Sequence, residues 1–150
     1  VRWPVNERMC LSITNVHSPQ LGSTDGEKEE FYTQLEREYD HCPQHDVKVV
    51  IGDLNAQVEQ EETYKNDWKL TNDNSPRLIN FASSKHMSIR STFFQHAHRL
   101  SYTWRYPKGD SKSQIDHVLI DGRHFSDIID VITFRGANVD SDHFLVMVKL

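Results

Sequence analysis

The amino-acid sequence predicts a mixed α/β fold, either an α+β arrangement or a layered α/β sandwich. Segments with the apolar, β-branched composition of strands outnumber the helical patterns, and the helical patterns lie early in the chain. No internal repeat, low-complexity tract or long linker divides the 150 residues, a length that allows one domain with a sizeable core. We therefore expect a single layered domain.

Several segments are predicted to be strands because they combine apolar side chains with β-branched or aromatic residues. They are residues 9–16, 47–51, 88–94, 102–106, 114–120, 128–134 and 144–150. The run VKVVI has the composition of a central strand, and Gly52 ends it. The stretch from 57 to 74 is polar, so we expect turns there.

Two helices are predicted between these strands. Asp25 is the expected N-cap of the first helix, because acidic residues follow it in the first turn, where they interact favourably with the helix dipole. Apolar residues then recur every fourth position as one stripe, and a proline ends the helix. The second helix is expected to open at Asn74 or Ser75, directly before another proline.

The composition excludes several classes of protein. No apolar run reaches the roughly 18 residues of a membrane span, which excludes an integral membrane protein. Cys10 and Cys42 form no CxxC pair and no Asn-x-Ser/Thr sequon occurs, so we expect no zinc ribbon, no disulfide partner and a reducing, intracellular compartment. The net charge of −5 lacks the basic excess of sequence-independent nucleic-acid binders, but it suits a metal-dependent phosphodiesterase, because carboxylates bind Mg²⁺.

The first candidate site segment is Gly52-Asp53-Leu54-Asn55, directly after the strand at 47–51. Alternation along a strand places Asp53 and Asn55 on the same side. There a carboxylate could orient a water molecule and an amide could donate to a phosphoryl oxygen. The alternative is a turn in which both side chains cap backbone amides, and this segment taken alone favours the turn.

Two further segments carry ionisable residues next to strands. Asp116 lies in the apolar segment 114–120 and needs a partner, either an ordinary backbone or lysine contact or a catalytic histidine; alone, it slightly favours the ordinary contact. Asp142 and His143 precede the last strand and could bind metal and act as base, or could form a solvated loop. Together the three segments hold what phosphodiester cleavage requires: carboxylates for a metal, a histidine and an amide donor.

The motifs GDLN, QIDHVLI and SDHFLV occur in the order and at the approximate separations seen in the endonuclease/exonuclease/phosphatase superfamily, which has the DNase I-like fold, and the sequence resembles that superfamily. NVHSP is similar to its strand-end motif, in which a Tyr or His contacts the phosphate. The closer resemblance is to craniofacial development protein 2-like proteins and to the endonuclease domain of RTE/BovB-type non-LTR retrotransposons. It rests on segments that span almost the whole chain: FYTQLEREYD, VVIGDLNAQV, RLINFASS, YTWRYP, QIDHVLIDGRHFSDIIDV and RGANVDSDH.

The resemblance implies a DNase I-like layered β-sandwich with flanking helices, and it implies catalytic roles for five residues. Asp53 would orient or deprotonate the attacking water, and Asn55 would hydrogen-bond the scissile phosphate. His143 would stabilise the pentavalent phosphoryl group or act as base, while Asp116 would fix its tautomer. His17 would contact the phosphate or assist the leaving oxygen.

The resemblance also implies Mg²⁺, or Mn²⁺ in its place, as cofactor and DNA as partner. Asp142 would sit at or near the metal ion. Trp104 would pack near the nucleic acid, with Arg105 and Lys108 reaching phosphates, although core packing accounts for Trp104 equally well. We expect no membrane partner, and a nuclear location follows from the resemblance alone.

Superfamily members carry a metal-binding Glu on strands that precede the NVH motif, and this chain begins at Val1. We therefore expect residues 1–150 to form the C-terminal portion of a single endonuclease/exonuclease/phosphatase domain, with the N-terminal portion missing. The isolated chain should then bind Mg²⁺ weakly and be inactive. Apolar faces and strand edges left without the leading strands should lead to dimerisation or aggregation.

The function expected from the sequence is that of a Mg²⁺-dependent phosphodiesterase, specifically a DNA endonuclease of retrotransposon origin. One alternative within the same superfamily is a phosphatase that acts on small phosphoesters. The other is a non-catalytic, retrotransposon-derived relic or protein-binding module. Competition between plasmid DNA and small phosphoesters separates the two enzymatic alternatives.

Overall fold

The computed structural model describes residues 1–60, 68–70, 72–94, 96, 102–135 and 141–150. Within these residues the central element is a five-stranded mixed sheet in the order β1-β2-β3-β9-β6. Its strands are β1 (Arg2–Pro4), β2 (Cys10–His17), β3 (Val47–Asp53), β6 (Met87–Ile89) and β9 (Asp116–Asp121). β2 and β3 run parallel, whereas the other neighbouring strands pair antiparallel. The C-terminal ends of β2 and β3 and the N-terminal end of β9 therefore lie side by side at one edge of the sheet.

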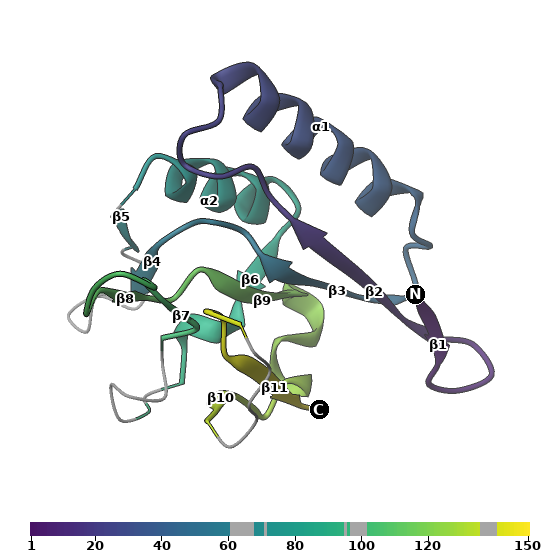
Figure 1. Ribbon diagram of the computed structural model, residues 1–150. Helices are drawn as coiled ribbons and strands as arrows, with labels where there is room; N and C mark the ends of the chain where they lie inside the picture. Colours follow the sequence, from purple (N-terminus) through teal and green to yellow (C-terminus); the bar gives the residue numbers. More distant parts are fainter. Residues whose placement is uncertain (61–67, 71, 95, 97–101, 136–140) are drawn as a thin grey trace.

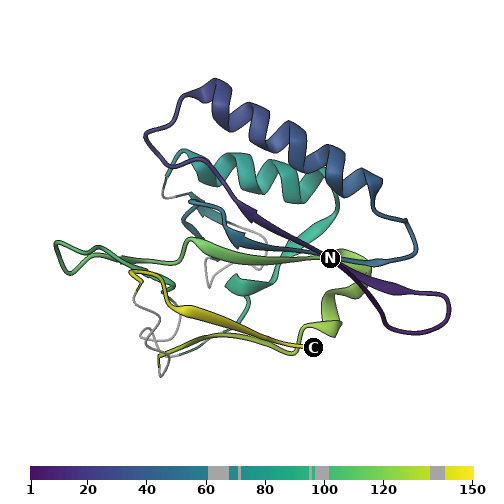
Figure 2. The same cartoon turned by 45° about the vertical axis from the view of Figure 1, so that its right-hand side comes forward.

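The sheet is the middle of three layers. Helices α1 (Asp25–His41) and α2 (Asn74–Ser84) cover one face (Figure 1). The antiparallel pair β10 (Asp130–Phe134) and β11 (Leu145–Lys149) lies under the other face, as Figure 2 shows. Smaller elements connect the layers: the pairs β4 (Val58–Gln60) with β5 (Trp68–Leu70) and β7 (Trp104–Arg105) with β8 (Lys112–Ser113), and the 3₁₀ helices η1 (Arg90–Thr92) and η3 (Gly122–Asp127).

Each face of the sheet carries its own apolar core because side chains alternate along the strands. Val50 and Leu119 are buried against the helices, together with Leu35 of α1 and Phe81 of α2. Residues of the opposite parity on β3 and β9 form a second core with residues of and before β10; its members are Val47, Val49, Val118, Ile120, Ile128 and Val131, with Ile51 and Val146 partly buried beside them. Side chains of β3 at positions 49, 51 and 53 therefore share the face toward β11.

Gly52 allows the ends of β2 and β3 to approach closely. Its φ of +135° lies in a region that L side chains rarely adopt, and a Cβ at this position would lie 1.9 Å from the carbonyl oxygen of Val16. Val16 is its register partner on β2, so the next pair along the two strands is His17 with Asp53. The glycine therefore brings these two polar residues side by side.

The mixed α/β class and the layered architecture predicted from the sequence are confirmed, but some local predictions were wrong. Thr24, not Asp25, is the N-cap of α1: its hydroxyl accepts from the N–H of Glu27, and the Glu27 carboxylate accepts from the N–H of Thr24. The strand expected at 88–94 ends at Ile89 and continues as η1. The strand expected at 102–106 is reduced to two residues, and β1 was not expected at all.

Several expectations about the boundaries of the domain and its surroundings remain predictions. The assignment of residues 1–150 to the later portion of a larger domain is one of them. Within the part of the chain that the structure describes, the helices are too short or too polar to traverse a lipid bilayer. Cys10 and Cys42 are both free thiols. The segment RGANVDSDH falls partly outside the described residues, since positions 136–140 are not among them.

Candidate active site

Three polar residues line up across three adjacent strands. Asp53 ends β3, and it pairs with His17 at the end of β2 on one side and with Asp116 at the start of β9 on the other. Register partners project from the same face of a sheet, and the alternation along β3 directs Asp53 toward β11. The row therefore faces the loop that leads into β11.

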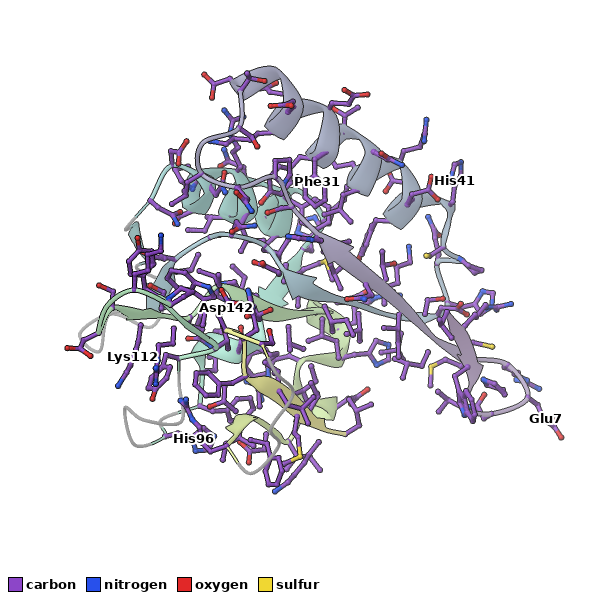
Figure 3. The ribbon with its side chains drawn as sticks, viewed as in Figure 1. Glu7, Phe31, His41, His96, Lys112 and Asp142 are labelled. Carbon is purple, nitrogen blue, oxygen red and sulfur yellow. The ribbon has the colours of Figure 1, made fainter. Side chains whose placement is uncertain are left out.

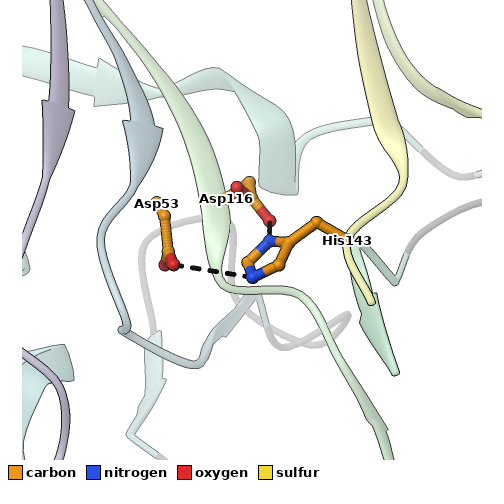
Figure 4. A group of neighbouring side chains, drawn as sticks. All are labelled: Asp53, Asp116 and His143. Carbon is orange, nitrogen blue, oxygen red and sulfur yellow. Dashed lines mark hydrogen bonds and ion pairs between the residues drawn. The ribbon is translucent and has the colours of Figure 1, made fainter. Parts of the chain in front are cut away.

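His143 reaches this row from the second layer of strands. It lies in the loop before β11 and forms an isolated antiparallel bridge with Trp104. Its Nδ1 lies 3.0 Å from Oδ2 of Asp116, and its Nε2 lies 3.7 Å from Oδ2 of Asp53 (Figure 4). The Asp116 carboxylate accepts a hydrogen bond from Nδ1–H, so Nε2 is the nitrogen turned toward Asp53.

Asp53 lies between two imidazoles. Nε2 of His17 is 3.6 Å from the same Oδ2 that faces His143. The two histidines differ in exposure, since 71% of the His17 side chain is accessible to solvent, against 31% of that of His143. His17 is therefore the partner that bulk solvent or a substrate can reach directly, whereas His143 is held by Asp116.

The electrostatics of the row oppose the negative charge on Asp53. Burial is the largest influence and raises the pKa of Asp53, and the nearby Asp116 carboxylate raises it further. The backbone N–H of Asn55 and the two histidines act in the opposite direction without cancelling the effect. A carboxylate in this setting gains from a proton or a cation nearby.

The residues of this row could hold a metal ion. Among the described residues, Asp53, Asp116 and His143 form a group in which one ligand atom of each lies within 4.8 Å of the others. Oxygen ligands suit Mg²⁺ or Mn²⁺, and a cation would relieve the cost of two adjacent carboxylates. The donor set therefore fits a divalent cation, with carboxylate oxygens as the ligand atoms that Mg²⁺ or Mn²⁺ prefers.

A cleft of about 480 Å³ opens beside the row. Its walls are formed by His17, Gln20, Leu21, Gly22, Asp53, Asn55, Gln57, Asn72, Trp104, Ile115, Asp142 and His143. The structure brings His17, Asp53, Asn55, Asp142 and His143 together at this cleft. Gln20, Gln57 and Asn72 also line it but were not expected from the sequence. Their signal was weak, because polar amides in polar segments are typical of any loop.

Asp142 and Trp104 form one wall of the cleft. The indole Nε1 of Trp104 donates to Oδ2 of Asp142 over 2.8 Å, which fixes the carboxylate and the ring relative to each other. Figure 3 shows Asp142 next to the hairpin of β7 and β8, which also carries Lys112. Asp142 is thus at the cleft but outside the group formed by Asp53, Asp116 and His143.

The two cations expected to contact substrate lie on the same hairpin but outside the described lining of the cleft. Arg105 has an exposed side chain, and its backbone N–H donates to the carbonyl of Asp142. Lys108 is exposed in the turn between β7 and β8. The hairpin therefore presents positive charge beside the cleft and not within it.

Asn55 lines the cleft and has an unusual backbone conformation. Its φ of +46° is left-handed, which asparagine tolerates better than most residues. Its backbone N–H donates to Oδ1 of Asp53, and its side-chain Nδ2 donates to the carbonyl of Ser18. Asn55 therefore connects the loops that follow β2 and β3.

Comparison with curated proteins finds relatives of one kind, whereas no protein-family model matches the chain. The chain is 33% identical over 143 residues to "Craniofacial development protein 2" of Bos taurus, and equally to that of Tragulus javanicus. Each match covers 93% of this chain but only 24% and 25% of those relatives. The chain thus spans about a quarter of the length of the curated relatives that it matches.

Comparison with solved structures places the fold. A 3′-5′ exonuclease, NExo, from Neisseria meningitidis superimposes with a TM-score of 0.69 at 20% identity, and the match covers 95% of this chain and 61% of that one. The endonuclease domain of TRAS1, a telomere-specific non-LTR retrotransposon, superimposes with a TM-score of 0.58 at 14% identity, covering 95% and 56%. The chain is therefore similar over most of its length to the craniofacial development protein 2 proteins and has the DNase I-like fold of these nucleases.

Proposed function

We propose that the chain carries the catalytic residues of a Mg²⁺-dependent phosphodiesterase that acts on DNA, as an endonuclease of retrotransposon origin. One observation carries the proposal: Asp116 holds Nδ1 of His143, so that Nε2 faces Asp53 at the wall of a cleft. A histidine oriented by a carboxylate, beside a second carboxylate and an amide, is the set of groups that in-line attack on a phosphodiester requires.

The geometry supports the following roles. Asp53 would orient the attacking water, and its raised pKa makes it a better base than an exposed aspartate. Nε2 of His143 would accept a proton or hydrogen-bond the phosphoryl oxygens, with Asp116 stabilising the imidazolium that forms. Asn55 donates with Nδ2 to Ser18, and we assign the second N–H of that group to the scissile phosphate.

Asp142 is the carboxylate that we assign to the metal, because it lines the cleft, whereas Asp53 is assigned to the attacking water and Asp116 is engaged with His143. Mg²⁺ bound there would supply positive charge to the phosphoryl and leaving oxygens. The Trp104 hydrogen bond keeps one oxygen of Asp142 in place. His17, which is the most exposed member of the row, would contact the phosphate or the leaving oxygen.

DNA is the proposed substrate because of the hairpin beside the cleft. Trp104 offers an aromatic surface at the cleft, and Arg105 and Lys108 on the same hairpin offer cations to phosphates beside the reacting one. The DNA-bound neighbour, a 3′ phosphatase from Neisseria in complex with a product DNA hairpin, superimposes with a TM-score of 0.66 at 18% identity. The net charge of −5 favours the second candidate, a phosphatase for small phosphoesters.

The test is a nicking assay on supercoiled plasmid with the full-length gene product. We expect nicking that requires Mg²⁺ or Mn²⁺, is stopped by EDTA, and is lost in Asp53→Asn. The control is Asp127→Asn, a carboxylate exposed on η3 that pairs with His124. Inositol phosphates and nucleotides are added as competing substrates.

Each outcome of this assay decides between the alternatives. Nicking that small phosphoesters do not suppress supports the endonuclease. Hydrolysis of small phosphoesters without nicking would replace it with the phosphatase. The absence of both activities, with a folded protein and metal present, would overturn the enzymatic proposal in favour of a relic or binding module.

A further inference from the structure

The segment that follows β3 carries Asn55 and is held by side chains from other parts of the chain. Its carbonyl groups at three consecutive positions accept hydrogen bonds from outside the segment. The Asn55 carbonyl accepts from Nδ2 of Asn72 over 3.1 Å and from Nδ2 of Asn74 over 3.0 Å. Such bonds fix the backbone where no sheet partner does so.

The next two carbonyls are held in the same way. Nε2 of His117 lies 2.8 Å from the carbonyl oxygen of Ala56, and Oγ of Ser75 donates to the carbonyl of Gln57 over 2.7 Å. A carbonyl only accepts, so Nε2 of His117 carries the proton. Nδ1 then accepts from the hydroxyl of Ser91, 3.0 Å away. His117 is thereby fixed in a single tautomer.

The side chains that hold the segment are buried. Asn74 is 2% exposed, Ser75 is fully buried and His117 is 1% exposed. Neither Asn74 nor His117 belongs to the described lining of the cleft. A substrate in the cleft would therefore meet the segment that they hold and not these side chains themselves.

Asn74 also connects the segment to the loop after β2. Its Nδ2 lies 3.2 Å from the carbonyl of Pro19, in addition to its bond to the Asn55 carbonyl. Asn55 donates to Ser18 in that same loop. The first turn of α2 thus holds together the two loops that present His17 on one side and Asp53 on the other.

The left-handed backbone of Asn55 is the conformation that this support stabilises. A non-glycine residue at positive φ persists only where its surroundings over-determine it. The N–H of Asn55 bonds Oδ1 of Asp53 over 2.9 Å, so a change in this backbone would reorient the carboxylate as well.

We infer that Asn74 and His117 are positioning residues: through the Asn55 and Ala56 carbonyls they set the orientation of Asn55 and Asp53 for the reaction. The inference rests on the proposed phosphodiesterase function. It extends that function to residues that touch neither the substrate nor the metal. The expected consequence of losing either residue is a lower kcat with little change in KM, because substrate contacts are retained while the reacting groups are misplaced.

The first test compares Asn74→Leu with Asn80→Leu. Leucine matches asparagine in size but cannot donate, and Asn80 is an exposed residue of the same helix. We expect kcat for plasmid nicking to fall about 10- to 100-fold in Asn74→Leu, with KM within about twofold of the wild-type value. Asn80→Leu should leave both unchanged. In parallel, the three-bond HN–Hα coupling of Asn55 should change in Asn74→Leu and not in Asn80→Leu.

The second test uses His117, which keeps the positioning role testable if Asn74→Leu folds poorly. Glutamine can place an N–H near the position of Nε2, whereas leucine cannot. We expect His117→Gln to keep kcat within a few-fold of wild type and His117→Leu to lose most of it. A merely space-filling role for His117 would make the two variants equally impaired.

The outcomes separate this inference from the proposed function. A folded Asn74→Leu that keeps kcat and the Asn55 coupling overturns the positioning role. Equal impairment of His117→Gln and His117→Leu also overturns it for that residue. An inactive wild-type protein would overturn the proposed function alone, because the Asn55 coupling in Asn74→Leu still decides whether Asn74 sets the local backbone.

Discussion

Gly52→Ala is the substitution whose effect follows most directly from the structure. The added Cβ would lie 1.9 Å from the carbonyl oxygen of Val16 and 2.9 Å from its carbonyl carbon and amide nitrogen. These atoms belong to the β2 backbone, which cannot move without breaking its pairing with β3. The φ of +135° adds a conformational cost that alanine cannot avoid.

The size of the effect can be worked from these two contributions. Backbone strain of this kind costs about 1–3 kcal/mol, and a forced shift in a packed region costs a similar amount, so we expect a loss of about 4 kcal/mol in the free energy of unfolding. For a domain of this length that corresponds to a fall in Tm of roughly 8–16 °C. Urea denaturation at 25 °C and calorimetry measure both quantities.

Gly26→Ala is the matched control for this prediction. Gly26 lies in α1, its φ is not left-handed, and a Cβ there would have no atom within 4 Å. Alanine in a helix is favoured over glycine by about 0.5–1 kcal/mol, so Tm should stay or rise slightly. If Gly52→Ala were as stable as the wild type, the close approach of β2 and β3, and the juxtaposition of His17 and Asp53 that depends on it, would be refuted.

Four further predictions concern the site, the core, the pH dependence and self-association. Asp116→Asn should lower kcat for nicking by at least about 100-fold while Tm stays within a few degrees, because an uncharged amide no longer stabilises the His143 imidazolium and can hold the ring in the wrong tautomer; an unchanged kcat would contradict the assigned role. Leu54→Ala, at a fully buried position, should lower the free energy of unfolding by about 3 kcal/mol in urea titrations. The hydrogen bonds from Arg2 hold the pKa of Asp46 below its usual range, so this carboxylate stabilises the fold fully above the unfolded-state pKa near 4 and loses that contribution progressively as pH falls from there through the lower folded-state pKa; acid titration of Tm should therefore be shallower in Asp46→Asn. The chain on its own should self-associate through the exposed apolar side chains of β10 and β11, and light scattering that shows a monodisperse monomer would be evidence against this.

The parts of the fold that could be predicted are those with a strong local pattern. The run before Gly52 is β-branched and ends at a glycine, and it is indeed the central strand β3. Strand β1 could not be found, because its residues are exposed and its pairing with β2 is a long-range interaction. The strand expected at 88–94 stops early because Arg90 turns inward, where its guanidinium packs over the rings of Phe94 and Phe125.

In the candidate site, too, the features with a local sequence pattern could be predicted and those that depend on long-range contacts could not. Its residue types and their places at strand ends were readable, and the expected pairing of Asp116 with His143 is present in the structure. The positioning roles that we infer for Asn74 and His117 could not be predicted from the sequence, because each depends on a contact with a carbonyl group distant in the sequence. Sequence motifs show which side chains can react, whereas the groups that hold them emerge only once the chain is folded.

The measurement that tests the central claim most directly is the Mg²⁺-dependent nicking rate of the full-length gene product in His143→Gln, compared with His124→Gln. His124 is a matched control because it pairs with Asp127 over 2.9 Å, much as His143 pairs with Asp116, but lies in η3. We predict a loss of at least about 100-fold in rate for His143→Gln and an unchanged rate for His124→Gln. Equal rates in the wild type and His143→Gln would contradict it.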